Sequence, residues 1–211
     1  MGGIVFGCIV PHPPIIIPEI GKGRLKEANA TYDSMRLLAR EMSDYAIDTV
    51  VIISPHGVNY YDSMGVATAP TSDGSFDSWG VKGLDYRFPN DSEFVNALME
   101  EAKRTSIPLL SIGDYIYDLD HGVLVPFYFL KSAASGAALV PVTFSWLPFT
   151  VHFAFGQVMR RTAEKLQKNV AIVASGDLSH RLIPGAPAGY APEGKVFDES
   201  IVEAVRELAA R

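Results

Sequence analysis

The sequence contains one cysteine, no long apolar run and no block of basic residues. Cys8 alone cannot form an internal disulfide, which fits a reducing compartment. Apolar runs such as residues 15–17 end at prolines and fall far short of the roughly 20 residues that span a bilayer. The first residues do not combine a basic segment, an apolar stretch and a small-residue cleavage site, so no secretory signal is visible. We therefore expect a cytoplasmic protein that does not span a membrane.

The charge balance argues against a polyanion partner. Lysine and arginine total 18 against 24 acidic residues, which gives a formal net charge of -6. A nucleic acid would meet a repulsive field rather than a basic stripe, so nucleic-acid binding is disfavoured. The apolar share of 48% and charged share of 20% are typical of a globular enzyme and far from a disordered composition.

Sequence motifs for phosphate binding and hydrolysis are missing as well. No GxxxxGK[ST] loop is present, and Gly21 and Gly23 lack the third glycine of GxGxxG. Neither HExxH nor GxSxG occurs. Asp177 and Ser179 beside His180 resemble a nucleophilic triad only superficially, because a serine nucleophile needs a strained turn that this segment does not indicate. These absences leave metal-assisted chemistry as the class to consider.

Short apolar runs alternate with amphipathic stretches, which predicts an α/β fold. Residues 4–10 and 49–54 have the composition of strands buried on both faces. Between them, apolar positions recur every three or four residues over 24–46, as on one face of a helix. This order calls for a crossover connection and parallel strands. Further strands are expected at 107–112, 138–142 and 170–175, and further helices at 94–102, 123–134, 151–166 and 197–208.

We therefore expect a single domain over residues 1–211, with a mostly parallel central sheet and helices on both faces. Residues 59–89 turn to glycine, serine, aspartate and tyrosine. This composition predicts an insertion over one edge of the sheet, with a hairpin around 64–69.

Three of the five histidines follow predicted strands. His12, His56 and His180 each come shortly after an apolar run, and ligands of open α/β sheets bind beyond the carboxyl ends of the strands. A lone histidine is more often a structural residue than a ligand. Three at equivalent strand ends, which a parallel sheet would gather at one edge, indicate a site.

The other candidate residues carry weaker signals. His121 precedes a predicted helix within a turn-rich segment, so a helix-start residue and a functional residue are both open. His152 lies within a helix pattern beside the apolar stripe, and we assign it to structure. Cys8 lies roughly 13 Å from His12 along the strand, so a small core residue is the better interpretation than a soft ligand.

Four segments together resemble a known family. VPHPP at 10–14, SPHG at 54–57, LDHG at 119–122 and SGDLSH at 175–180 are similar, in order and spacing, to the LigB-type catalytic subunit of class III extradiol ring-cleavage dioxygenases. The Memo-like proteins are relatives of this family. The resemblance covers nearly the whole chain.

The resemblance implies a mononuclear Fe(II) held by two histidines and a glutamate, with His12 and His56 as the histidines. Such a site leaves open positions for a small aromatic substrate of catechol type and for O2. His180 would be the acid/base, a role suited to an imidazole with an unperturbed pKa near 6.5. His121 would line the same pocket. A homo-oligomer or a small partner subunit is compatible with the family.

The glutamate ligand is missing from the expected context. In the family it follows the last helix, and none of Glu193, Glu199 and Glu203 matches. The final helical pattern reaches Arg211 without a stop signal. We therefore expect the chain to be truncated at its C-terminus, with the glutamate beyond Arg211.

A non-oxygenase function is the alternative. Memo-like members keep the histidines without an established ring-cleaving role, and there the residue matching His180 is more similar to a metal ligand than to a base. This reading implies a metal-binding or redox protein with Zn or another divalent metal. A zinc hydrolase is a third possibility.

Overall fold

The computed structural model describes residues 2–113, 116–186 and 188–209. The chain forms two compact units, Met1–Gly176 and Asp177–Arg211. The strands of the first unit are β1 (Gly3–Val10), β2 (Thr49–Ser54), β3 (Met64–Ala67), β4 (Thr71–Ser75), β5 (Asp85–Pro89), β6 (Leu109–Ile112), β7 (Ile116–Asp118), β8 (Ala138–Thr143) and β9 (Asn169–Ser175). Its helices are η1 (Pro14–Ile16), α1 (Pro18–Gly21), η2 (Lys22–Ala28), α2 (Asn29–Met42), η3 (Asp77–Trp79), α3 (Ser92–Arg104), α4 (His121–Leu130) and α5 (Phe149–Leu166). The second unit contains α6 (Pro192–Ala209).

The central sheet has six strands in the order β1-β9-β2-β8-β3-β6. Strands β1, β9, β2 and β8 pair in parallel, as do β3 and β6, whereas β3 and β8 are antiparallel. The predicted mostly parallel sheet is confirmed. The first two strands of the chain are not neighbours, because β9 lies between β1 and β2.

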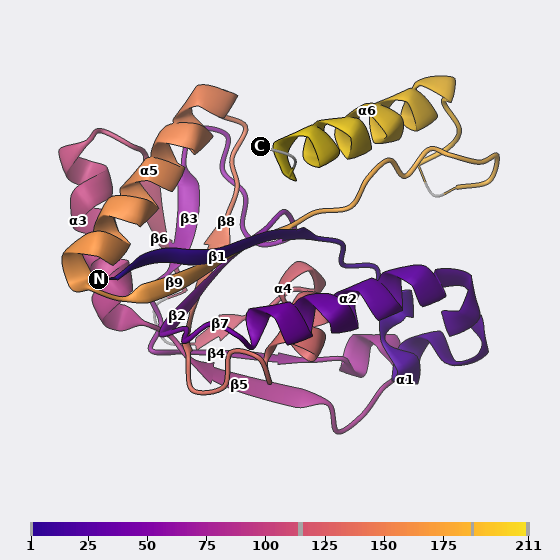
Figure 1. Cartoon of the computed structure of the whole chain (residues 1–211), viewed down its shortest axis with the longest axis horizontal. Coiled ribbons are helices and arrows are strands. Elements are labelled where there is room, and N and C mark those ends of the chain that lie inside the picture. Colours follow the sequence, from indigo (N-terminus) through magenta and orange to yellow (C-terminus); the bar gives the residue numbers. More distant parts are fainter. Residues whose placement is uncertain (1, 114–115, 187, 210–211) are drawn as a thin grey trace. The chain divides into compact units, whose positions relative to one another are not determined.

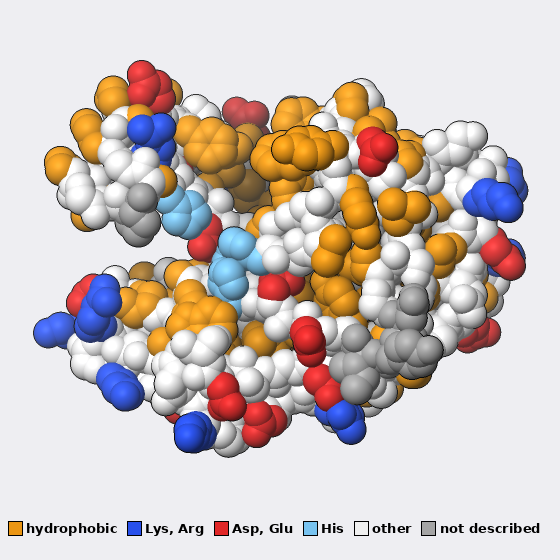
Figure 2. Space-filling model, turned by 180° about the vertical axis from the view of Figure 1, so that it is seen from behind, with side chains coloured by type: hydrophobic (Ala, Val, Ile, Leu, Met, Phe, Trp, Pro, Cys, Tyr) orange, Lys and Arg blue, Asp and Glu red, His pale blue; other side chains and the backbone are white. Residues whose placement is uncertain are grey.

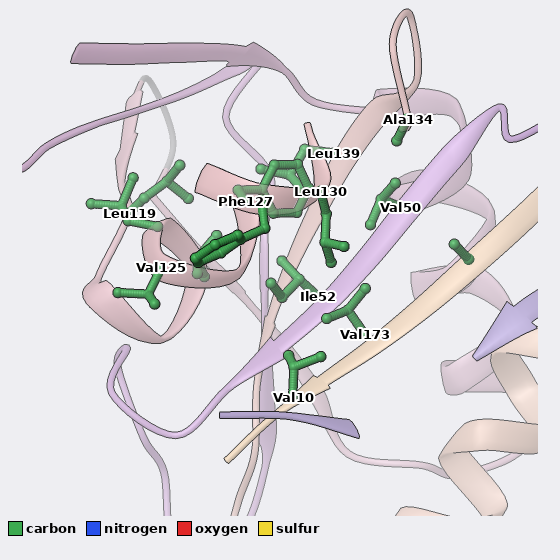
Figure 3. Close-up of a cluster of buried hydrophobic side chains, with 14 of the residues drawn as sticks. Val10, Val50, Ile52, Leu119, Val125, Phe127, Leu130, Ala134, Leu139 and Val173 are labelled. Atoms are coloured by element: carbon green, nitrogen blue, oxygen red, sulfur yellow. The ribbon is translucent and has the colours of Figure 1, made fainter. Parts of the chain in front are cut away.

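Helices cover both faces of this sheet (Figure 1). Along β2, Val50 and Ile52 join the apolar cluster under α2 and α4, whereas Val51 joins the cluster under α3 and α5. This alternation follows from the two-residue period of a strand. Figure 3 shows the first cluster, where Ile52 lies near Val173 of β9 and below Leu130 of α4. A central strand buried on both faces explains the unbroken apolar run that the sequence has there.

The predicted insertion at 59–89 is wrong in part. Met64–Ala67 does not form a hairpin over an edge but is β3, a strand of the central sheet between β8 and β6. The rest contributes β4 and β5, which form a second sheet with β7 in the order β5-β4-β7. Strand β4 reads TSDGS, a sequence with weak intrinsic strand preference. Its pairing with both neighbours decides its conformation, because strand preference depends strongly on context.

Two helices have bounds that differ from those predicted. The predicted helix at 24–46 is shorter, because residues before 29 form the 3-10 helix η2 and α2 ends at Met42. The helix predicted at 123–134 begins at His121 and ends at Leu130. Asp120 caps it by accepting a hydrogen bond from the Gly122 N–H at 2.7 Å, which satisfies one of the unpaired donors at a helix start.

Among the described residues, no helix has both the length and the apolar character needed to cross a membrane.

A buried ion pair holds the amino ends of the strands. The carboxylate of Asp91, 6% exposed, caps α3 by accepting from the Phe94 N–H at 3.0 Å. It also accepts from Thr49 Oγ1 at 2.5 Å and from Lys168 Nζ at 2.7 Å. Burial alone would raise the pKa of Asp91, but the hydrogen bonds from Lys168, Thr49 and Phe94 outweigh it and lower the pKa. One carboxylate therefore ties together α3, β2 and the residue that precedes β9.

We expect Asp91→Ala to lower the free energy of unfolding by about 3 kcal/mol or more, because it leaves Lys168 partly buried without its main partner. Chemical denaturation measures this. Glu93→Gln is the matched control, because Glu93 contacts the same lysine from a mostly exposed position and should cost less than about 1 kcal/mol.

The pair also predicts a pH dependence. Because the pKa of folded Asp91 lies below its unfolded value, its stabilisation is present above about pH 4 and is lost as the pH falls through the folded pKa. Stability measured against pH should therefore fall less steeply below pH 4 in Asp91→Asn than in the wild type. Equal slopes would contradict the assignment.

Candidate metal centre

Three imidazoles meet at the carboxyl edge of the central sheet. His12 lies two residues after β1, His56 lies two residues after β2, and His121 is the first residue of α4. The ring centroids are 4.8 Å apart for His12 and His56, 5.3 Å for His12 and His121, and 4.0 Å for His56 and His121. One nitrogen from each ring lies within 4.8 Å of the other two. The structure thus brings together both predicted ligands and His121.

The register of the sheet places His12 and His56 level with each other. Strand β9 pairs Ser175 with Val10 of β1 and Ala174 with Ile53 of β2. Each strand is followed directly by a proline, Pro11 or Pro55, which cannot donate to a strand ladder. The next residue in each case is the histidine, so both side chains reach the same place beyond the sheet.

The hydrogen bonds of His12 orient its ring toward the cluster. His12 is 2% exposed, and its Nδ1 lies 2.8 Å from Ser175 Oγ. A protonated Nδ1 that donates to this hydroxyl leaves the Nε2 lone pair available to a metal, the usual arrangement of ligating histidines. The Nε2 atoms of His12 and His56 are 2.9 Å apart. Two lone pairs at that distance repel unless a proton or a cation lies between them, so the donor set fits a metal ion.

The site is open on one side. His56 is exposed and His121 is half-buried, in contrast to His12. Figure 2 shows histidine side chains, in pale blue, at the surface of this face of the molecule. Among the described residues this group of potential ligands contains three histidines and no carboxylate. Imidazole ligands suit Zn, Cu, Fe and Ni, so the donor set alone leaves the metal open.

Trp79 forms an aromatic wall beside the histidines. Its ring centroid lies 5.6 Å from that of His121, with the planes inclined by 58°. Phe76, which is fully buried, supports Trp79 from 6.0 Å away, and Gly80 closes this short 3-10 turn with a φ of 75°. Sequence reasoning missed Trp79, because it lies in the segment that was predicted to be an insertion. A lone tryptophan in a loop-rich stretch gives no signal that would have found it.

Ser175 was also missed as a separate contributor, although it begins the SGDLSH segment. His152 lies in the first turns of α5 and contacts the residues just before this helix: its Nε2 accepts from the Ser145 N–H at 3.4 Å, and its Nδ1 lies 3.3 Å from the Pro148 O. These contacts fit the structural role assigned to it.

Burial raises the pKa of the Cys8 thiol to about 11, so Cys8 stays protonated and is a poor ligand or nucleophile.

His180 belongs to the second unit. Its Nε2 lies 3.7 Å from Asp177 Oδ2, and its side chain is 64% exposed. The adjacent Ser179 N–H donates to Asp198 Oδ1 at 2.8 Å, which holds this segment to α6. The acid/base role of His180 stays a prediction.

The fold and the histidine cluster define an α/β protein with a candidate metal centre. The family model of the catalytic LigB subunit of aromatic ring-opening dioxygenase matches residues 7–209, and the chain belongs to this family. Protein CA_C1420 of Clostridium acetobutylicum is 31% identical over 206 residues, which cover 94% of this chain and 44% of that protein. The chain thus spans less than half the length of this relative. An uncharacterized Escherichia coli K12 protein of known structure, JW3007, is 19% identical with a TM-score of 0.49, over 68% of this chain and 54% of that one.

We expect His12→Ala and His56→Ala each to weaken binding of a divalent metal by more than about 100-fold, beyond the 10- to 100-fold typical of outer-shell partners. Titration with Fe(II) under anaerobic conditions, or with Zn(II), measures this. His152→Ala is the matched control and should bind as the wild type does. Wild-type affinity in both cluster variants would contradict the assignment.

His121→Ala separates two roles. If His121 is the third ligand, the variant should lose metal as the other two do. If it lines the substrate pocket, metal should stay bound while substrate binding weakens. Wild-type behaviour in both assays would return His121 to a purely structural role.

Proposed function

We propose that the chain is a non-haem Fe(II)-dependent dioxygenase that cleaves a catechol-type aromatic ring in the extradiol position with O2. The observation that carries this proposal is the cluster of His12, His56 and His121 at the sheet edge of a LigB family member. His12 and His56 would hold the iron. When bound, the metal supplies one centre that can accept both the catechol oxygens and dioxygen.

The residues around the centre would orient a ligand, line the substrate space and transfer protons. The Ser175 hydroxyl holds His12 in one orientation. His121, whose ring centroid lies 4.0 Å from that of His56, would line the space where a substrate enters. His180 would take the second phenolic proton and return a proton during cleavage, since an imidazole can both accept and donate near neutral pH. The partly exposed ring of Trp79 would flank the substrate ring, because aromatic rings attract in tilted or offset arrangements.

A second candidate is a non-oxygenase metal-binding or redox protein of Memo type. The observation that favours it is the donor set, which among the described residues consists of three imidazoles without a carboxylate. Three histidines with an open fourth position are a common zinc arrangement. In that case Zn or another divalent metal would replace Fe(II), and no aromatic substrate would be required.

Oxygen uptake by the anaerobically Fe(II)-loaded protein, measured over a panel of catechols, tests the proposal. Consumption of one O2 per catechol, with the absorbance of a ring-opened product, would support ring cleavage. Uptake without a ring-opened product would support a redox function, and metal binding without uptake would support the zinc alternative. The His12→Ala variant controls for oxygen consumed by free iron.

For His180 we expect His180→Ala to keep the metal while lowering turnover by roughly 100-fold or more, the usual scale of general acid/base catalysis. Metal content and oxygen uptake of the same preparation measure both effects. Loss of metal from this variant would instead favour the three-histidine arrangement of Memo-like relatives.

Replacement of Trp79 tests the aromatic wall. We expect Trp79→Ala to raise KM for the catechol by roughly 2- to 10-fold with less effect on kcat, since an aromatic pair contributes about 0.5–1.5 kcal/mol. Trp79→Phe should retain most of the affinity. Trp146→Ala is the control, because Trp146 is exposed and its ring contacts Phe144 rather than a histidine of the cluster. Equal KM values in all variants would exclude Trp79 from the substrate site.

A further inference from the structure

The carboxylate of Asp120 joins two of the histidine-bearing segments. Its Oδ1 accepts the Ser54 hydroxyl at 2.6 Å and the Gly122 N–H at 2.7 Å. The second bond caps α4, whose first residue is His121. The first bond reaches across to the end of β2, 66 positions away in the sequence.

Ser54 carries this connection on to His56. Its side chain is buried, and its Oγ accepts the His56 N–H at 3.2 Å while donating to Asp120. A continuous chain of hydrogen bonds therefore runs from the backbone of His56 through Ser54 to Asp120, and from there to the backbone beside His121. This carboxylate therefore links the two segments through hydrogen bonds to both of them.

The glycines that follow the two histidines allow this close approach. A Cβ on Gly122 would lie 2.3 Å from Ser54 Oγ and 2.9 Å from Asp120 Oδ1. A Cβ on Gly57 would lie 2.6 Å from both Thr143 Cγ2 and the Tyr117 hydroxyl. Neither position has room for a larger residue. The glycine of LDHG is thus required by the packing of Ser54 against Asp120, and the glycine of SPHG is required by the packing of Thr143 and Tyr117.

The other oxygen of Asp120 adds a cost that a purely structural cap would not need. Oδ2 is buried and finds no hydrogen-bond partner among the described residues. A buried acceptor without a hydrogen-bond partner destabilises the folded state, and a neutral capping residue would avoid burying a charge. Burial, together with the negative charge of Asp120, raises the pKa of Tyr117 to about 12, so its phenol stays protonated.

We propose that Asp120 is a positioning residue of the metal centre, which sets the separation and orientation of His56 and His121 through Ser54 and the Gly122 N–H. This inference rests on the metal-binding part of the proposed function. It does not depend on whether the metal serves ring cleavage, a redox reaction or another role.

Metal affinity and the absorption spectrum of bound Co(II) together test the proposal in the full chain. Zn(II) affinity measured against a chelator reports the strength of the site, and the ligand-field bands of Co(II) report its geometry. Asp120→Ala should weaken Zn(II) binding by about 10- to 100-fold, the effect typical of outer-shell partners, and should shift the Co(II) bands. Asp120→Asn keeps an oxygen that can accept both hydrogen bonds and should restore most of the affinity.

Three further variants complete the test. Ser54→Ala removes the link to His56 while leaving the cap of α4 in place, and should weaken Zn(II) binding by roughly 10-fold. The double variant should lose less than the sum of the single effects, because both residues act in one network. Asp118→Ala, an exposed aspartate two residues before Asp120, is the matched control and should behave as the wild type.

Circular dichroism and thermal melting identify variants that do not fold. If Asp120→Ala does not fold, Ser54→Ala decides the outcome. If the folded Asp120→Ala or Ser54→Ala protein keeps wild-type Zn(II) affinity and Co(II) bands, the proposal is overturned. A wild-type chain that binds neither metal would overturn the metal-dependent function itself, and this inference with it. The two failures are therefore distinguishable.

Discussion

Parallel pairing of β9 with β1 on one side and β2 on the other is the constraint on which the site depends. This pairing aligns two strands, β1 and β2, that are far apart in the sequence. Their carboxyl ends therefore lie side by side at the same edge of the sheet. His12 and His56 each lie two residues past a strand end and after a proline. A slip of one residue would exchange the two faces of a strand and would move its histidine away from the other. The cluster is therefore a product of strand register.

The two edges of the sheet meet different requirements. At the amino edge, Asp91 joins Thr49 and Lys168 in a buried network in which every donor reaches the carboxylate. At the carboxyl edge, the imidazole rings lie close together, and one oxygen of Asp120 has no hydrogen-bond partner among the residues that the structure describes. Buried polar groups are normally satisfied, and each exception needs an explanation such as a functional role or a bound water or ion. The same sheet thus supplies stability at one edge and tolerates unfavourable contacts at the other, where a cation bound by the imidazoles would relieve the contact between their nitrogens.

The sequence by itself determined the class of fold, the family and two members of the cluster. The apolar runs at 4–10 and 49–54 and the pattern of amphipathic helices are local signals, because side-chain periodicity depends only on the backbone conformation of the same segment. His12 and His56 could be predicted from the same signals, since a residue that follows a parallel strand must lie at the carboxyl edge. The four motifs, taken in order, indicated the LigB family.

The tertiary structure decided what joins these parts. It placed β9 between β1 and β2, added Met64–Ala67 to the central sheet, and brought His121 to a ring distance of 4.0 Å from His56. It also brought Ser175, Trp79 and Asp120 to the cluster from three separate segments. No local pattern carries this information, because strand order and loop packing arise from contacts between residues far apart in the sequence, and their energies depend on neighbours that a single segment does not specify.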